Sequence, residues 1–463
     1  MQTPLGTPTT LALFTDLYEL RMAQAYHALG MKERAVFSLF VRKLPPTRNL
    51  FLACGLEPFL DELEQLRFDP ASLGYLSSLG EFPVSFIDWL GELRFSGDVH
   101  AMAEGTPFFT NEPILEIDAP VAEAQLLETL VMNQVGLSTL LASKAVRVVT
   151  AAAGRSVVDF GSRRAHGIDA ALKGARAFHV AGVDATSNVL AAALYGLRPA
   201  GTMAHSYVQA FASEKEAFAR YLEQHPETIL LVDTYDTLNG VQHVIELARA
   251  LGPRFKARGI RLDSGDLGAL AKSARAMLDG AGLQSVEIFA SGGLDENEIE
   301  RLIKDGSPID AFGVGTDLSV SADAPSLDIA YKLTEYAGIG RMKLSTGKVS
   351  LPGRKQVFRS FRNGVAESDV IACAGEHADG QPLLECVMKD GRRTKPRAEL
   401  GNIRTHAKTA LASLPKRLLS LTAAAPPYAI MISAGLQEAE RAARARIEQA
   451  AANYILVPTF KET

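Results

Sequence analysis

The chain has 463 residues, of which 47% are hydrophobic and 22% charged, a balance typical of a globular protein large enough for about three domains. Its net charge of -5 argues against a nucleic-acid partner, and no apolar run reaches the ~18 residues that span a membrane, so we expect no membrane partner either. Three dispersed cysteines without CxxC spacing exclude a disulfide framework and fit a reducing compartment, so we expect a cytoplasmic protein.

The first 120 residues combine helical and strand-like patterns. Apolar side chains at helical spacing predict a helix over 12–29, with Thr15 as its N-cap, and Val36–Val41 predicts a strand. Residues 55–91 favour helices that break at Pro70 and Pro83, and 95–117 favour short antiparallel strands. We therefore expect an N-terminal α/β domain over 1–120.

The middle of the chain alternates between strands and helices. A further strand is predicted at Val157–Phe160, after a strongly helical stretch at 120–143. Four β-rich runs follow at 228–232, 259–262, 286–290 and 310–314, and helical patterns at 239–251, 267–280 and 295–304 separate them. This alternation, at roughly 25–30 residues per unit, is typical of parallel strands joined by crossover helices. We expect an α/β catalytic domain over 121–350, followed by C-terminal strands and helices over 351–463, some of which could return to the N-terminal domain.

Glycine-rich loops follow two of the predicted parallel strands. Ser291-Gly292-Gly293 precedes a helix, and Gly313-Val-Gly315-Thr316 follows the next strand. Glycines let backbone N–H groups approach a phosphate, and a helix N-terminus adds partial positive charge. Either motif alone is a common turn, but their consecutive placement at strand ends favours a phosphate site, because ligands of α/β folds bind there.

Carboxylates follow two other strands. Asp263-Ser264-Gly-Asp266 and Asp233-Thr-Tyr-Asp236 could hold sugar hydroxyls, or Mg²⁺ bound to a diphosphate. The alternative interpretation is that these residues cap helices, Asp266 that over 267–280.

Three further groups could bind anions or carry chemistry. Arg261 lies in an apolar strand on the same face as Asp263, where it pairs either with an internal Asp or with a substrate carboxylate. Arg163 and Arg164 follow the strand at 157–160 and suit a phosphate or diphosphate, or else form a basic surface turn. His205 lies in a loop of small residues and by itself is more typical of a structural histidine.

The order of these motifs resembles the nicotinate phosphoribosyltransferase family, from about residue 10 to 335. The motifs are Thr15-Asp-Leu-Tyr18, Asp159-Phe-Gly-Ser-Arg-Arg164, Gly201-Thr202-x-x-His205-Ser206, Arg261-Leu-Asp-Ser-Gly-Asp266 and Gly313-x-Gly-Thr316. The resemblance implies an N-terminal α/β sandwich domain with an incomplete α/β barrel of the type II phosphoribosyltransferase kind, as a homodimer. It also implies that nicotinate and 5-phosphoribosyl 1-diphosphate give nicotinate mononucleotide and diphosphate in pyridine nucleotide salvage, driven by ATP hydrolysis.

The resemblance also assigns roles. Tyr18 would stack on the nicotinate ring, Thr202 would contact nicotinate and Arg261 would bind its carboxylate. His205 would be transiently phosphorylated by ATP, and Asp263 would stabilise the oxocarbenium-like transition state. Mg²⁺ would accompany the diphosphate, and no protein metal ligands are assigned with certainty. The residues expected to bind phosphoribosyl diphosphate are Arg163, Arg164, Asp233, Ser264, Asp266, Ser291, Gly292, Gly293, Gly315 and Thr316.

Three alternatives compete with this assignment. A sister enzyme acting on nicotinamide would not need Arg261, and one acting on quinolinate would need more basic residues. A non-catalytic paralogue would show damaged motifs. A barrel aldolase or isomerase that shares only the phosphate loops would need a lysine or a base at a strand end, and neither Lys272 nor Lys304 lies at one.

Overall fold

The computed structural model describes residues 11–345 and 350–455, which form two compact units. Unit 1 contains the chain up to Thr139, Leu327–Leu418 and the chain from Thr422 onward, and unit 2 contains Leu140–Ser326 and Leu419–Leu421. The units therefore change at 139 and 327, whereas the sequence suggested boundaries at 120 and 350. Nearly all of the described residues after 350 belong to the same unit as the N-terminus.

The helices of unit 1 begin where the sequence provides start signals. Pro70 occupies the first turn of α4 and Asp69 caps it by accepting a hydrogen bond from Ser72 N–H, while Pro83 directly precedes α5. The predicted N-cap at Thr15 is wrong by one residue: Asp16 holds that position, and the Thr15 hydroxyl instead donates to Glu19 at 2.6 Å. The helices are α2 (Leu17–Ala28), α3 (Leu56–Gln65), α4 (Pro70–Ser78), α5 (Val84–Glu92), α6 (Val121–Gln125), α16 (Leu400–Ala412) and α17 (Ala434–Ile455).

A seven-stranded antiparallel sheet forms the centre of unit 1, with the strand order β13-β12-β1-β5-β3-β17-β18. Seven of the eight residues of β1 are buried, because the strand has partners on both edges and packing on both faces. A smaller sheet has the order β16-β14-β15-β19, and β2 pairs with β4. The strands are β1 (Arg34–Val41), β2 (Phe51–Leu52), β3 (Asp98–Met102), β4 (Pro107–Phe108), β5 (Leu115–Pro120), β12 (Ile329–Tyr336), β13 (Ile339–Gly340), β14 (Lys355–Arg362), β15 (Val365–Cys373), β16 (Gln381–Pro382), β17 (Leu384–Lys389), β18 (Arg392–Arg393) and β19 (Ala429–Ile432).

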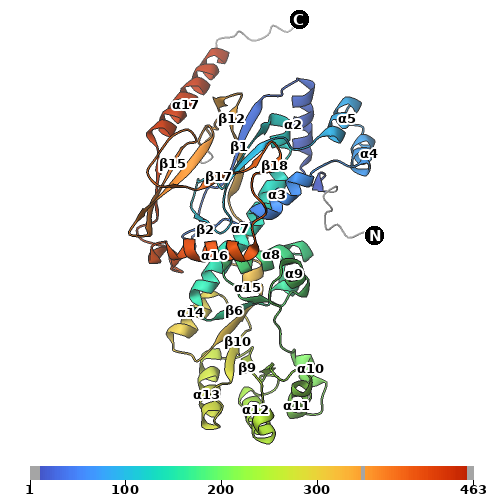
Figure 1. The fold of residues 1–463 in the computed structure, drawn as a ribbon, viewed down its shortest axis with the longest axis vertical. Helices are drawn as coiled ribbons and strands as arrows, with labels where there is room; N and C mark the ends of the chain where they lie inside the picture. The colour runs from blue at the N-terminus through green and yellow to red at the C-terminus, as the bar shows by residue number, and fades with distance from the viewer. Residues whose placement is uncertain (1–10, 346–349, 456–463) are drawn as a thin grey trace. The chain divides into compact units, whose positions relative to one another are not determined.

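Unit 2 is built on a curled sheet of six parallel strands in the order β7-β6-β11-β10-β9-β8 (Figure 1). β6 pairs with β11, so the first and last strands of the unit are neighbours, as in a barrel, while β7 and β8 remain as the two edges. This confirms the expected α/β fold with an incomplete barrel. The strands are β6 (Ser156–Asp159), β7 (Ala185–Thr186), β8 (Ile229–Leu231), β9 (Gly259–Leu262), β10 (Glu287–Ala290) and β11 (Ala311–Val314).

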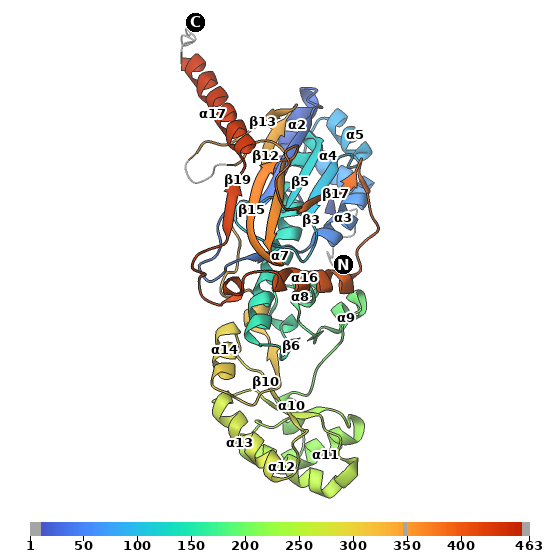
Figure 2. The same ribbon diagram turned by 60° about the vertical axis from the view of Figure 1, so that its left-hand side comes forward.

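Crossover helices connect these strands, and α13 lies beside β9 and β10 (Figure 2). Asp236, Asp266 and Asp295 cap α12, α13 and α14, each accepting a backbone N–H three residues further on. The capping role proposed as an alternative for Asp236 and Asp266 is therefore present in the fold. The helices are α7 (Glu128–Ala151), which crosses from unit 1, then α8 (Ile168–Ala181), α9 (Val189–Tyr195), α10 (His205–Gln209), α11 (Glu214–Gln224), α12 (Thr237–Leu251), α13 (Leu267–Gly280), α14 (Glu296–Lys304) and α15 (Thr316–Ser319).

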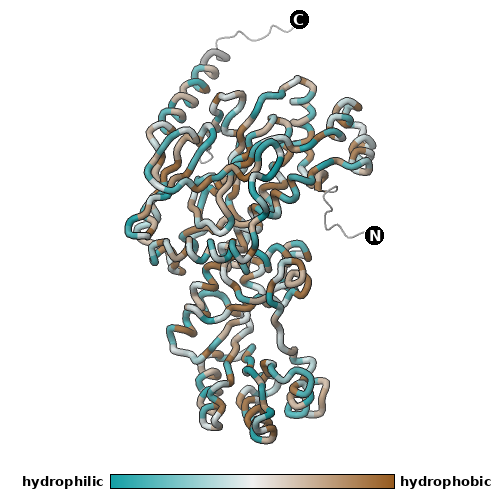
Figure 3. Tube along the Cα trace, viewed as in Figure 1, coloured by the Kyte–Doolittle hydropathy of each residue, from teal (hydrophilic) through white to brown (hydrophobic). Residues whose placement is uncertain are grey.

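The last helix, α17, has a mixed surface. Hydrophilic and hydrophobic residues alternate along it (Figure 3), and Leu436 and Ala443 are its buried apolar residues up to position 451. None of the helices within residues 11–345 and 350–455 is both long and apolar enough to span a membrane.

Candidate active site

Three consecutive loops at the carboxyl ends of β8, β9 and β10 are joined by hydrogen bonds. Asp233 Oδ2, after β8, accepts the Asp263 N–H at 2.9 Å and the Ser264 hydroxyl at 2.6 Å. The Ser291 hydroxyl, after β10, donates to Asp263 Oδ1 at 2.5 Å. The sequence predicts ligand binding at these strand ends. The structure joins Asp233, Asp263, Ser264 and Ser291 in one hydrogen-bond network.

This network leaves carboxylate oxygens for a ligand. Asp233 Oδ1 is buried and finds no hydrogen-bond partner among the described residues. Asp263 Oδ2 lies 3.8 Å from His205 Nε2, and both side chains are about one-third exposed or more. Such oxygens can accept hydrogen bonds from sugar hydroxyls or bind a hard cation.

Arg261 extends from β9 into a poorly hydrated environment. Burial lowers the pKa of its guanidinium, and the negative charges of Asp263 and Asp233 oppose this shift. Nη2 donates to the Met203 carbonyl at 3.1 Å, but the buried Nε has no acceptor within the described part of the chain. Arg261 is therefore a half-buried cation with an unused donor, which suits an anionic ligand.

His205 is the first residue of α10. Its Nδ1 lies 3.2 Å from the Thr234 hydroxyl oxygen, in the loop after β8. When that oxygen accepts the Nδ1–H, Nε2 carries the lone pair and faces the Asp263 carboxylate. His205 therefore lies between the loops that follow β8 and β9, with its side chain 40% exposed.

The two glycine loops both carry hydrogen-bond donors at strand ends. Gly292 and Gly293 have φ of +90° and +63°, and neither N–H donates a hydrogen bond to another described residue. Gly315 directly precedes the short helix α15, whose first residue, Thr316, is exposed. Both loops therefore present backbone or hydroxyl donors at strand ends, as a phosphate requires.

A buried carboxylate fixes the start of the loop after β6 by hydrogen bonds. Asp159 accepts the Gly161 N–H and the Thr186 hydroxyl, both at 2.7 Å, and burial raises its pKa. Arg163 and Arg164 follow in a 3₁₀ turn, and both are exposed. The positive charge of Arg163 contributes to lowering the pKa of Arg261, so these two cations lie near one another.

The two remaining predicted residues lie in different units. Thr202 is half-buried in unit 2, where it lines a cavity of about 230 Å³ together with Phe160 and Phe289. Tyr18 lies on α2 of unit 1, where burial and then the charge of Glu128 raise its pKa. The structure therefore collects the other predicted residues in unit 2, but not Tyr18.

Several supporting residues were not predicted from the sequence. Asp159 and Thr234 hold the β6 loop and His205, and the Phe160 ring lies 5.9 Å from the Arg261 guanidinium. Thr234 directly follows Asp233, and Asp159 and Phe160 belong to the same sequence motif as Arg163 and Arg164, so membership of these motifs is the signal that could have identified them. Their partners come from other loops, so spacing alone does not reveal the contacts.

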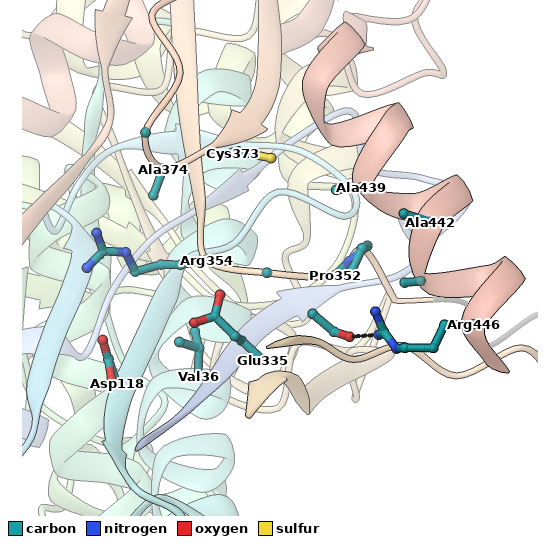
Figure 4. A pocket seen from close by; sticks show the side chains of 14 residues that line it. Val36, Asp118, Glu335, Pro352, Arg354, Cys373, Ala374, Ala439, Ala442 and Arg446 are labelled. Atoms are coloured by element: carbon teal, nitrogen blue, oxygen red, sulfur yellow. Dashed lines mark hydrogen bonds between the residues drawn. The ribbon is translucent and has the colours of Figure 1, made fainter. Parts of the chain in front are cut away.

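A larger cavity of about 600 Å³ lies elsewhere, in unit 1, and is lined by α17 and by residues of β13, β12, β1 and β5 (Figure 4). Asp118, Glu335, Arg354 and Arg446 contribute its charged side chains. It contains none of the predicted site residues, so cavity size does not identify the active site. The network of carboxylates, Arg261 and His205 in unit 2 is the candidate site.

Comparisons with known proteins identify the family of the chain. The chain matches the nicotinate phosphoribosyltransferase (NAPRTase) N-terminal domain over residues 13–136 and the NAPRTase family over 155–348. The chain belongs to the nicotinate phosphoribosyltransferase family. It is 55% identical over 423 residues to nicotinate phosphoribosyltransferase pncB2 of Mycobacterium tuberculosis, covering 91% of each chain. It is 42% identical to the Bacillus subtilis nicotinate phosphoribosyltransferase, and the match covers 81% of this chain and 79% of that protein.

A solved structure of human nicotinic acid phosphoribosyltransferase has the same fold, with a TM-score of 0.83 and 28% identity over 92% of this chain and 99% of that chain. The family resemblance inferred from the motifs is therefore confirmed. As a nicotinate phosphoribosyltransferase family member, the chain has its charged site in the catalytic part that these comparisons cover.

In this nicotinate phosphoribosyltransferase, we expect Gly292→Ala to lower kcat/KM by roughly 10²-fold, since small displacements in an active site have effects of this size. A methyl group at Gly292 would collide with the Asp263 carbonyl, and φ of +90° disfavours any side chain. Steady-state kinetics check this, with Gly280→Ala as the control, because a methyl group there meets nothing within 4 Å. An active Gly292→Ala enzyme with normal constants would show that the loop does not approach a ligand.

Proposed function

We propose that this protein catalyses the reaction of nicotinate with 5-phosphoribosyl 1-diphosphate. The pyridine nitrogen bonds to ribose C1, the bond from C1 to the diphosphate oxygen breaks, and nicotinate mononucleotide and diphosphate leave. The observation that carries the choice of substrate is Arg261, whose buried Nε lacks an acceptor among the described residues. A nicotinate carboxylate supplies the missing anion, whereas an uncharged amide does not.

Thr202 and Tyr18 complete the proposed nicotinate site. Thr202 and Phe160 line the same cavity, and the Phe160 ring lies 5.9 Å from the Arg261 guanidinium, so Phe160 connects the two proposed nicotinate contacts. Tyr18 is 45% exposed and offers a ring for stacking.

Phosphoribosyl diphosphate is proposed to bind across the strand-end loops. The Gly292 and Gly293 N–H groups have no acceptor among the described residues and are proposed to bind the 5-phosphate together with Gly315 and Thr316 of the next loop. The exposed Arg163 and Arg164 suit the diphosphate, because guanidinium groups bind phosphate oxygens in pairs.

The carboxylates are proposed to bind the ribose and to oppose the charge that develops on it. Asp263 stabilises the oxocarbenium-like transition state, and Asp233, Ser264 and Asp266 bind the hydroxyl groups or the hydrated cation. No group of three or more metal-ligating side chains is preformed in the described ranges. The orphaned Asp233 Oδ1 nevertheless fits a hard cation that arrives with the diphosphate. Mg²⁺ bound there neutralises the negative charge of the departing diphosphate.

We also propose that ATP drives the reaction through His205. Nε2 attacks the γ-phosphorus of ATP, the bond to the ADP oxygen breaks and ADP leaves; water later hydrolyses the phosphohistidine. The contact between Nδ1 and Thr234 supports this step, because the tautomer in which Nδ1–H donates to that hydroxyl leaves the lone pair on Nε2. The 40% exposed side chain leaves room for a phosphoryl group.

A homodimer is part of the proposal. Exposed apolar side chains gather on one face at the start of unit 1, at Phe14, Leu17, Tyr18 and Met22. In water such a patch is typical of an interface, so Tyr18 could serve the site of a second copy. Light scattering coupled to gel filtration should give twice the chain mass of 49.7 kDa.

The decisive experiment offers the purified protein nicotinate, nicotinamide and quinolinate in turn, with 5-phosphoribosyl 1-diphosphate and Mg²⁺, and with or without ATP. We expect nicotinate mononucleotide as the main product and faster turnover when ATP is present. Equal turnover of nicotinamide would contradict the carboxylate role of Arg261. No turnover of any of the three would support a non-catalytic paralogue.

A further inference from the structure

Four charged side chains of unit 2 form a closed set of buried ion pairs, called the buried square below: Lys144, Arg147, Glu296 and Asp323. Lys144 and Arg147, one turn apart on α7, face Glu296 and Asp323. Lys144 Nζ lies 2.5 Å from Glu296 Oε2 and 3.2 Å from Asp323 Oδ1. Arg147 Nε lies 2.8 Å from Glu296 Oε1 and 3.8 Å from Asp323 Oδ2. Each carboxylate therefore uses one oxygen for each cation.

The square is almost completely dehydrated. The side chains of Lys144 and Glu296 are each 1% exposed, and those of Arg147 and Asp323 are 8% and 11% exposed. Buried ion pairs contribute little net stability, because losing hydration costs about as much as the attraction returns. Their geometry is specific, however, and removing one member leaves a buried uncompensated charge. The square is therefore better understood as a device that fixes positions than as a source of stability.

The positions it fixes belong to the proposed phosphate site. Glu296 is the first residue of α14, which follows Ser291-Gly292-Gly293 after a short connection. Asp323 lies in the turn after α15, the helix that begins directly after Gly315. The same pair of cations on one rigid helix thus holds the segments that follow both loops.

A third carboxylate links the square to the second loop. Asp317, in the first turn of α15, lies next to Thr316. Its pKa is raised by burial, with Lys144 acting in the opposite direction and Asp295 and Glu296 adding to the rise. Asp317 therefore lies within electrostatic reach of the square and of the start of α14.

We propose that Lys144 and Glu296 are positioning residues for 5-phosphoribosyl 1-diphosphate, holding the Gly292–Gly293 loop and the Gly315–Thr316 loop at the separation that the phosphorylated substrate needs. The inference rests on the proposed placement of the phosphates at these loops. It distinguishes the two substrates, since nicotinate is bound by Arg261 and Thr202, which the square does not touch.

The test compares Lys144→Met with the wild-type protein. We expect KM for 5-phosphoribosyl 1-diphosphate to rise at least tenfold, while KM for nicotinate changes less than about twofold. Calorimetric titration with inorganic diphosphate and with 5-phosphoribosyl 1-diphosphate should show the same selective loss without turnover. Glu296→Gln keeps the shape of the side chain and the hydrogen bond from Lys144, so it should raise the KM for 5-phosphoribosyl 1-diphosphate less. If Lys144→Met does not fold, Glu296→Gln provides the same measurement.

Lys355→Met is the matched control. Lys355 is also a buried lysine, with its Nζ 3.0 Å from Glu116 Oε1, but it belongs to the sheets of unit 1. We expect it to lower the melting temperature without changing either KM. If Lys144→Met and Glu296→Gln behave in the same way, the square is purely structural and the proposal is wrong. If the wild-type protein itself fails to bind 5-phosphoribosyl 1-diphosphate, the proposed function fails first.

Discussion

Replacing Arg261 by Gln is expected to lower kcat/KM for nicotinate by roughly two to three powers of ten. The reason is that breaking a buried charge pair costs about 3–5 kcal/mol, and each 1.4 kcal/mol corresponds to a factor of ten. The environment of Arg261 supports the higher part of this range, because its guanidinium is largely dehydrated and its Nε has no acceptor among the residues that the structure describes. Initial-rate kinetics with nicotinate and nicotinamide measure the effect.

The discrimination between the two pyridines provides the sharper readout. Without the guanidinium, the preference for nicotinate over nicotinamide should nearly disappear, because neither substrate then meets a cation. Arg261→Lys keeps the charge but not the two-point hydrogen bonding, so its preference for nicotinate should fall between those of the wild-type protein and Arg261→Gln. Arg275→Gln is the control: Arg275 lies on α13, which follows the same strand, and is paired with Asp279 at 2.7 Å away from the proposed nicotinate contacts. A preference for nicotinate that survives in Arg261→Gln would place the carboxylate elsewhere.

The second large effect is expected from His205→Ala, which should abolish the stimulation by ATP. The imidazole Nε2, 3.8 Å from Asp263 Oδ2, is the proposed phosphoryl acceptor, and the methyl group of alanine offers no nucleophile in its place. Turnover without ATP should remain within about threefold of the wild-type rate, because the loops that bind the ribose phosphate are intact. Acid-labile, base-stable labelling from γ-labelled ATP should be lost.

His243→Ala is the matched control for this experiment. His243 is also a half-buried histidine of unit 2, hydrogen-bonded through Nδ1 to Glu214 at 3.0 Å, but it lies within α12. This variant should keep both the label and the stimulation by ATP. Labelling that persists in His205→Ala would assign the phosphoryl group to another residue and refute the proposed step.

Local patterns in the sequence predicted the parallel sheet well. The helix expected at 267–280 is α13, Leu267–Gly280, and the strand expected at 259–262 is β9, Gly259–Leu262. Both are delimited by nearby glycine or aspartate residues, so their bounds depend on a few consecutive residues. The grouping of Asp233, Asp263 and Ser291 was equally predictable, because parallel strands end at one edge of a sheet.

Long-range partners could not be predicted in this way. Nothing near Arg261 in the sequence indicates that its guanidinium meets the carbonyl of Met203, and nothing near His205 indicates Thr234. The buried square has the same origin, since Lys144 and Glu296 are 152 residues apart. Periodicity identifies which side chains are buried or exposed on an element, but not which element lies opposite.

The interrupted course of unit 1 through the sequence has a consequence for synthesis on the ribosome. β1 needs β12 at one edge and β3 needs β17, yet both partners follow the long segment Leu140–Ser326 of unit 2 in the chain. As the chain emerges, one edge of β1 and one edge of β3 stay unpaired until β12 and β17 are synthesised. Unpaired strand edges are templates for aggregation. Unit 2, in contrast, has all six of its strands once Val314 has emerged. The catalytic half is therefore able to fold first, and the half that begins the chain finishes last.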